Sequence, residues 1–125
     1  MDLQRKIRKV ERATGLSIAL VDGVLVTYDQ ELDEQLFELP IGTPSNHEKA
    51  LHRFHEDIYH ARARRKHQMQ GGKCALCGRQ MGDMGECDHI LTRGAHGRDD
   101  RMENLQIVCN PCHRTKHGER VKYVW

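Results

Sequence analysis

The sequence predicts an α+β protein: a short helix and a β-hairpin, then a long basic helix, then a small cysteine-containing core. Three observations support this fold class. Two apolar, β-branched runs flank Asp22-Gly23. Apolar residues recur with a helical period through residues 45–70. Two Cys-x-x-Cys motifs lie in the last 55 or so residues, and the 125-residue chain has the size of one domain.

The composition predicts a small hydrophobic core and excludes membrane proteins. Only 38% of the residues are hydrophobic, and the mean hydropathy is −0.75. The longest apolar stretch, residues 16–26, is interrupted by Ser17, Asp22 and Gly23, so it is too short and too polar to span a bilayer. The basic N-terminus lacks the apolar segment of a secretory signal. We therefore expect an intracellular protein without a membrane partner.

The first 44 residues predict a helix, a hairpin and a second short helix. Residues 2–13 are highly charged but keep Leu3, Ile7 and Val10 on one helical face. Asp22-Gly23 is a strong signal for a type I′ turn joining two strands within residues 17–28. Residues 29–39 are acidic with scattered apolar positions, which we interpret as a short helix. The prolines and glycine within residues 40–44 then predict a linker.

Residues 45–69 carry the clearest helix pattern. Ser45 to Glu48 has the form of a capping box, and a helix from there should stop at the glycines of residues 71–72. The apolar stripe consists of Leu51, Phe54, Ile58 and Ala61. Five histidines mostly avoid that stripe, so we interpret them as surface residues: His47, His52, His55, His60 and His67.

The charge is distributed unevenly along the chain. Residues 28–38 contain five acids and no base, whereas residues 59–82 contain six bases and no acid. Such a basic run presents either a surface for a polyanion or only a solvated helix face. Charge alone does not separate these two interpretations.

The cysteines predict a structural zinc ion. Five cysteines are an odd number, which argues against a fully paired set of disulfides. Four of them form two Cys-x-x-Cys pairs, Cys74 with Cys77 and Cys109 with Cys112, and each such turn can supply two thiolates to a tetrahedral Zn²⁺. The alternative is that they are small buried apolar residues. Cys87 is most simply a buried strand residue.

A second group of metal-binding residue types lies between and after these turns. Asp88 and His89 adjoin each other in the segment ECDHIL, and a helix that starts at Asn110-Pro111 places His113 and His117 one turn apart on one face. Together with Asp88, the two imidazoles offer three ligands to one ion and leave open positions for water and a phosphate oxygen.

These motifs resemble the HNH endonuclease family. The resemblance rests on the two Cys-x-x-Cys turns, on Asp88-His89-Ile90, on Arg93-Gly94, on Glu103 to Gln106 and on Cys112-His113 with Lys116, and it covers residues 73–118. It implies a ββα-metal site, in which two strands joined by a long loop and a following helix surround one divalent ion. Gly94-Ala95 departs from the two glycines that many family loops carry.

The resemblance also implies a role for each matching residue. Asp88 and His113 would be ligands of a catalytic Mg²⁺, Mn²⁺, Ni²⁺ or Zn²⁺, with His89 as the general base and Asn104 as the residue that pins the loop. His117 corresponds to a histidine ligand of the nuclease colicins, whereas many members carry threonine there.

The expected activity is metal-dependent hydrolysis of DNA, leaving 5′-phosphate and 3′-hydroxyl ends. The expected phosphate contacts are Arg62, Arg64, Arg65, Lys66, Arg93, Arg98, Arg114 and Lys116. The alternative is a non-catalytic zinc module that binds nucleic acid or protein. An intact set of base, loop residue and metal ligands argues against that alternative, because a binding module needs no base beside an open metal site.

We expect three regions along the chain. Residues 1–44 form an appendage that could mediate a homodimer, dock a protein partner or only brace the core; residues 45–70 form a basic connecting helix; residues 71–125 form the nuclease core. The resemblance places such a protein in the cytoplasm of a bacterial or phage-infected cell. It leaves open whether the setting is phage packaging, restriction or homing.

Overall fold

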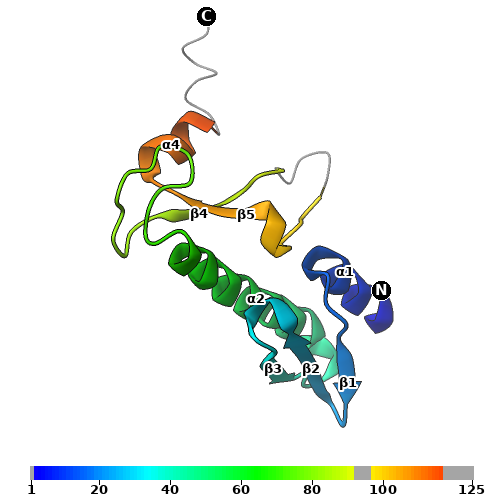
Figure 1. The fold of residues 1–125 in the computed structure, drawn as a ribbon. Helices are drawn as coiled ribbons and strands as arrows, with labels where there is room; N and C mark the ends of the chain where they lie inside the picture. The colour runs from blue at the N-terminus through cyan, green and yellow to red at the C-terminus, as the bar shows by residue number, and fades with distance from the viewer. Residues whose placement is uncertain (1, 92–96, 117–125) are drawn as a thin grey trace, which may run out of the picture.

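The α+β fold predicted from the sequence is confirmed by a computed structural model, which describes residues 2–91 and 97–116. Three α-helices are present in these ranges: α1 (Leu3–Thr14), α2 (His47–Met69) and α4 (Asn110–Arg114). The strands form two antiparallel sheets, one with β1 (Ala19–Val21), β2 (Val24–Asp29) and β3 (Gln35–Pro40), the other with β4 (Glu86–His89) and β5 (Leu105–Val108). The long helix α2 lies between these two sheets and contacts both (Figure 1). None of the described helices has the length and apolar character needed to cross a membrane.

The predicted hairpin is confirmed, and its turn has the expected geometry. Val21 pairs with Val24, so Asp22 and Gly23 alone form the connection. Their φ angles are 50° and 77°, both in the left-handed region that a type I′ turn requires. Asp22 accepts this conformation at modest cost because its short polar side chain tolerates it better than most.

The short helix predicted for residues 29–39 is wrong. A single 3₁₀ turn, Gln30–Leu32, is followed by Asp33 and Glu34 at φ angles of 57° and 60°, which reverse the chain and prevent helix propagation. The chain then returns as β3 beside β2. Along this strand Phe37 is buried while its neighbours Leu36 and Glu38 are exposed, so the apolar positions follow a strand period.

Helix α2 ends where the sequence predicts, but its start differs. The predicted capping box is wrong: the N-cap is Asn46, without a side-chain cap hydrogen bond, and Ser45 belongs to a preceding 3₁₀ turn. Glu48 is instead paired with Lys6 of α1 at 3.0 Å. At the other end, Gly71 has a φ of 64° and terminates the helix.

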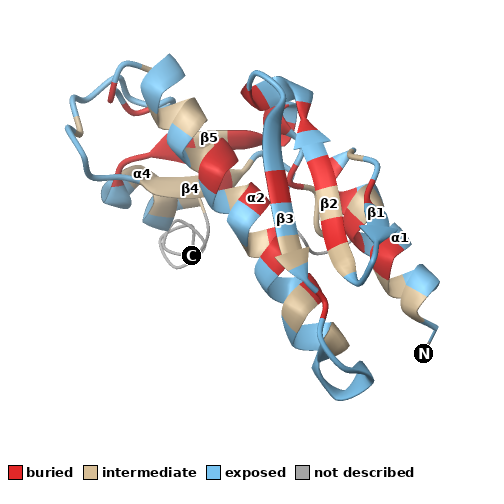
Figure 2. Cartoon of the chain, turned by 90° about the horizontal axis from the view of Figure 1, so that it is seen from below, coloured by how far each residue is buried: buried red, intermediate tan, exposed pale blue. Residues whose placement is uncertain are grey.

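The main hydrophobic core is formed by α1, the three-stranded sheet and α2. The predicted apolar stripe of α2 is confirmed, since all four of its residues are buried (Figure 2). The core residues of this cluster are Ile7, Val10, Ile18, Leu25, Leu32, Phe37, Ile41, Leu51, Phe54, Ile58 and Ala61. The first 44 residues therefore share one core with the long helix.

Arg62 is part of this interior, and the predicted DNA contact of this residue is wrong. Only 1% of its surface is exposed. Its guanidinium donates to both carboxylate oxygens of Asp29, at 2.7 and 3.2 Å, and to the backbone oxygens of Thr14 and Asp100, at 2.7 and 2.9 Å. A guanidinium with four internal acceptors is shielded from any phosphate, so the residue is structural.

We predict that Arg62→Ala lowers the free energy of unfolding by about 3–5 kcal/mol, because it leaves the carboxylate of Asp29 buried and unpaired. Thermal or urea denaturation measures this loss. The matched control is Arg64→Ala, which removes an exposed arginine from the same helix and should change stability by less than about 0.5 kcal/mol. Equal losses in the two variants would contradict a structural role for the buried pair.

Candidate metal centres and active site

The four paired cysteines converge on one point. Cys74 and Cys77 lie in the turn after α2, Cys109 follows β5, and Cys112 lies in α4. Their four sulfur atoms all lie within 4.8 Å of one another. Among the described residues, this is the group of three or more histidines, cysteines or acids placed closely enough to hold an ion.

The geometry of this cluster fits zinc. Four thiolates at about 2.3 Å from a tetrahedral Zn²⁺ lie about 3.8 Å apart along each edge of the tetrahedron. The sulfurs of Cys77 and Cys109 are 3.7 Å apart. The sulfur of Cys74 also accepts backbone N–H groups from Leu76, Cys77 and Cys109 at 3.3 to 3.5 Å. Burial alone would raise the pKa of Cys74, but these donors lower it to about 6, which favours the thiolate that a metal requires.

Strand β4 carries Asp88 into the interior on one of its faces. Asp88 is 1% exposed and lies opposite Gln106 of β5. Its Oδ2 accepts hydrogen bonds from Gln106 Nε2 at 2.9 Å and from Lys116 Nζ at 2.6 Å. Lys116 also donates to the backbone oxygens of His89 and Ile90, so it holds the end of β4 as well as the carboxylate.

His113 of α4 faces the same carboxylate. Its Nε2 lies 3.7 Å from Asp88 Oδ1, a separation that a single ion bound to both at about 2.1 Å can bridge. Its Nδ1 lies 2.6 Å from Glu86 Oε2, the carboxylate–histidine arrangement that commonly orients an imidazole toward a metal. These donors fit a divalent cation. Glu86 was missed in the sequence, where it precedes Cys87 as an ordinary strand acid; His117 lies outside the described residues.

Asn104 connects the two ends of the loop between β4 and β5. Its Oδ1 accepts the N–H of Leu91 at 2.7 Å, and its Nδ2 donates to the backbone oxygens of Leu91 and Asp99 at 3.3 and 2.7 Å. With 4% of its surface exposed, it uses both ends of its amide internally. These contacts hold the two ends of the loop together. The effect of Asn104 on catalysis stays a prediction.

His89, the neighbour of Asp88, is held by a carboxylate that the sequence analysis missed. Its Nε2 lies 2.6 Å from Oδ1 of Asp100, which is 0% exposed. The second oxygen of Asp100 lies 2.7 Å from His55 Nε2 and 2.6 Å from Arg98 Nε. Burial acts to raise the pKa of Asp100, but the hydrogen bonds with His55 and His89 and the charge of Arg98 outweigh it, so the pKa lies below its ordinary value. Asp100 is therefore a carboxylate at neutral pH.

These contacts correct two expectations about single residues. His55 is 7% exposed, so the prediction that it lies on the surface is wrong; the carboxylate of Asp100 stabilises a polar ring on the buried side of α2. Arg98, expected to contact phosphate, is paired with Asp100 and lies 2.7 Å from Glu56. In the sequence nothing distinguishes Asp100 from its neighbour Asp99, because its partners lie up to 45 residues away.

An aromatic ring completes the surroundings of His89. Tyr59 of α2 stacks on the imidazole with ring centroids 5.7 Å apart and planes 6° from parallel. Arg98 lies over the ring of the same tyrosine at 5.4 Å. Packing against Tyr59 and bonding to Asp100 leave the imidazole little rotational freedom, and 13% of its side chain reaches solvent. Tyr59 was also missed, since aromatic residues at helical spacing are typical of a core.

The remaining residues predicted to contact DNA differ in their exposure and in their ion pairs. Arg64 is exposed, Lys66 is half-buried, and Arg65 is paired with Asp33 at 3.0 Å. Arg114 lies in α4. Arg93 lies outside the described residues, and Cys87, predicted to be buried, is half-buried in β4.

Comparison with known proteins agrees with this geometry. Residues 74–119 match the family model described as HNH endonuclease, and this match covers a little over a third of the chain. It includes all four clustered cysteines, both residues of the Asp88-His89 pair and His113. The chain has no match among curated proteins and none among solved structures. Residues 74–119 are thus similar to the HNH endonuclease family, and this region holds four cysteines gathered in a candidate zinc site.

Proposed function

We propose that this protein is a metal-dependent endonuclease that hydrolyses phosphodiester bonds of DNA to 5′-phosphate and 3′-hydroxyl ends. The observation that carries the proposal is that two neighbouring residues of β4 have different partners. Asp88 Oδ1 lies 3.7 Å from His113 Nε2, a separation that one ion can bridge, whereas His89 is bonded to Asp100. A carboxylate–imidazole ligand pair and a separately oriented imidazole are the parts that such hydrolysis needs.

The residues divide the chemistry as follows. Asp100 accepts the Nε2 proton of His89, which fixes the tautomer and leaves Nδ1 as the atom that removes a proton from the attacking water. Asp88 and His113, with His117, would hold a divalent cation, which when bound neutralises the scissile phosphate and stabilises the departing 3′ oxygen. Glu86 keeps His113 oriented, and the four cysteines hold a separate structural Zn²⁺.

Contacts to the DNA backbone belong to the same proposal. The candidates that remain after Arg62 is assigned to the interior are Arg64, Arg65 and Lys66 of α2, Arg114 of α4, and Arg93. Arg65 would exchange its ion pair with Asp33 for a phosphate. Lys116 could contact phosphate only by leaving Asp88, to which its ammonium is bonded. A homodimer or protein partner bound through residues 1–44 stays an untested expectation.

A plasmid assay tests the proposal directly. Supercoiled plasmid is incubated with the purified chain and Mg²⁺, Mn²⁺ or Ni²⁺, and nicked and linear products are measured along with their end chemistry. The proposal requires metal-dependent conversion that EDTA stops. Binding of DNA without any conversion, in all three metals, would favour the non-catalytic zinc module instead.

We predict that His89→Ala reduces plasmid cleavage by about 10²–10⁴-fold, the usual contribution of a general base. Because the imidazole is not one of the proposed metal ligands, the metal content should change little, and the remaining bonds of Asp100 to His55 and Arg98 should keep the chain folded. The control is His60→Ala, which removes an exposed histidine one residue from Tyr59 and should leave activity intact. Cleavage by the His89 variant within about threefold of wild type would refute the assignment.

We predict that Asp100→Asn lowers kcat by about 10–100-fold with little change in KM, the loss typical when a carboxylate that orients a functional imidazole is removed. The asparagine keeps the shape but can present an N–H to His89 Nε2, so the distribution of imidazole tautomers should change. Nitrogen NMR of the labelled histidine detects this directly. His55→Ala, which removes the other imidazole on Asp100, should cost stability but preserve the tautomer. An unchanged tautomer and kcat in Asp100→Asn would show that the carboxylate is only structural.

We predict that Cys74→Ser releases one tightly bound zinc ion and lowers the melting temperature, because structural zinc contributes directly to folding. Elemental analysis of the purified variant gives the zinc content, and calorimetry gives the melting temperature. Cys87→Ser is the matched control, since this thiol lies outside the cluster. Wild-type protein that is active yet contains no zinc would contradict the structural site.

A further inference from the structure

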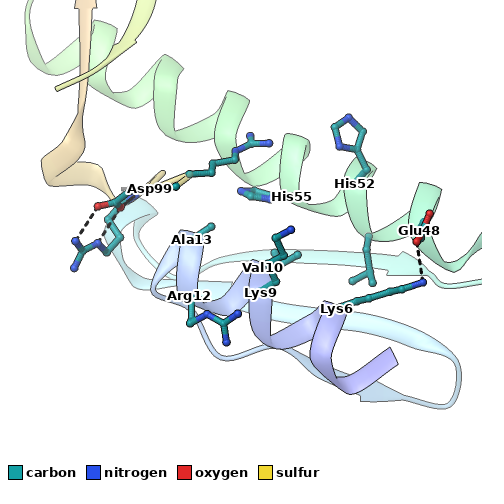
Figure 3. Close-up of a pocket in the computed structure, with 13 residues that line it drawn as sticks. Lys6, Lys9, Val10, Arg12, Ala13, Glu48, His52, His55 and Asp99 are labelled. Carbon is teal, nitrogen blue, oxygen red and sulfur yellow. Dashed lines mark hydrogen bonds and ion pairs between the residues drawn. The ribbon is translucent and has the colours of Figure 1, made fainter. Parts of the chain in front are cut away.

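A basic cleft lies between α1 and α2, away from the metal ligands. It has a volume of about 920 Å³ and is floored by Val10, Ala13 and Leu51. Five lysines and arginines line it, against two carboxylates, Glu48 and Asp99. Lys6, Lys9 and Arg12 come from α1, whereas His52 and His55 come from α2 (Figure 3). The excess of three positive charges favours an anionic occupant.

Internal ion pairs account for only part of this charge. Lys6 is paired with Glu48 at 3.0 Å, Arg101 with Asp99 at 2.8 Å, and Arg98 with Asp100 at 2.6 Å. Lys9 and Arg12 are exposed, and within the described ranges neither side chain has an ion-pair partner. The cleft thus retains two cations whose charges nothing in the described structure neutralises.

The distribution of the cations indicates an extended anion. From Lys9 to Arg12, the two cations without an ion-pair partner in the described ranges, the helix advances about 4.5 Å, at about 1.5 Å per residue. This rise is comparable with the separation of two successive phosphates of a DNA strand, which follow each other at about 3.4 Å along the duplex axis. The apolar side chains of Val10, Ala13 and Leu51 can contact the deoxyribose of a DNA strand. A free phosphate ion has no sugar to make this contact.

The cleft adjoins the proposed general base. His55 lines the cleft and is bonded to Asp100, whose other oxygen is bonded to His89. Arg98 also lines the cleft, and its guanidinium lies over Tyr59, the ring that stacks on His89. A strand seated in the cleft would therefore lie next to the residues that hold the base in place.

We propose that this α1–α2 cleft binds the sugar–phosphate backbone of the DNA substrate and extends its path from the metal site onto the N-terminal region. The inference rests on the proposed function, because it assigns a second contact surface to the same substrate. Lys9 and Arg12 contact phosphates directly. They contribute affinity and position the strand, whereas the metal ligands and His89 perform the chemistry.

Helix α1 itself supplies a matched control for the test. Lys9→Ala/Arg12→Ala removes two charges from the cleft, and Arg5→Ala/Arg8→Ala removes two exposed charges from the same helix outside it. Both pairs are placed in the full-length His89→Ala chain, which should bind without cutting. Binding to a short fluorescein-labelled duplex is measured by anisotropy over a range of salt concentrations.

The cleft pair should weaken binding and flatten the slope of log Kd against log salt by about 1.8 units, at about 0.9 per lost phosphate contact. The control pair should change the slope by less than half of that. Equal effects of the two pairs, or no effect of either, would overturn the cleft proposal. Acetylation of the unmodified wild-type chain gives a second measurement: duplex DNA should protect Lys9 more than Lys49, an exposed lysine of α2 outside the cleft.

The two proposals fail in distinguishable ways. A wild-type chain that neither binds the duplex nor cuts plasmid would overturn both. If the wild-type chain binds and cuts DNA, and the cleft and control variants bind DNA equally well, the cleft proposal is overturned and the endonuclease proposal stands. Equal acetylation of Lys9 and Lys49 in the presence of DNA would also overturn the cleft.

Discussion

The buried guanidinium of Arg62 is the constraint on which the rest of the structure depends. A charge removed from water is tolerated only when partners surround it, and here the partners come from three separate segments. Asp29 ends β2, Thr14 ends α1, and the backbone oxygen of Asp100 belongs to the loop before β5. Each segment is thereby fixed against α2. Because the side chain of the same Asp100 is bonded to His89, the position of the candidate base follows from the packing of this interior.

The cysteine cluster imposes a second constraint beyond the C-terminal end of α2. Within residues 2–91 and 97–116, the buried members of the apolar cluster there are Cys74, Val108 and Cys109, so two of the four clustered cysteines are also part of this small interior. Cys112 and His113 are neighbours in α4, a helix of five residues. An ion that fixes the sulfur of Cys112 also fixes the imidazole beside it, and with it the distance from His113 to Asp88. The cysteine cluster and the candidate catalytic site are therefore linked through α4, so a change in one should displace residues of the other.

A feature could be predicted from the sequence when the contacts that determine it lie within a few residues of each other. The turn at Asp22-Gly23, the apolar stripe of α2 and the cysteine spacing all act within a few residues, and each was predicted. The strand at residues 35–40 was not, because its conformation is decided by pairing with β2 and by the left-handed turn at residues 33–34. Likewise His55 and Asp100 are ordinary polar residues in the sequence. Only the fold brings them together, across 45 residues, and gives them a role beside His89.

The same reasoning revises what the uneven charge of the sequence means. The acidic segment 28–38 and the basic end of α2 look like two surfaces of opposite sign, but the fold places them against each other. Asp29 neutralises Arg62, and Asp33 is paired with Arg65. Two of the bases in the run at residues 62–66 are thus paired with acids of the protein itself. Helix α1 has five bases and one acid, so its positive charge is less conspicuous in the sequence than an acid-free run. In the fold, Glu11, its one acid, accepts the backbone N–H of Ile18 and, among the described residues, forms no ion pair with these bases. Within the part of the chain that the structure describes, α1 therefore keeps four bases without an ion-pair partner, Arg5, Arg8, Lys9 and Arg12, and the last two line the cleft.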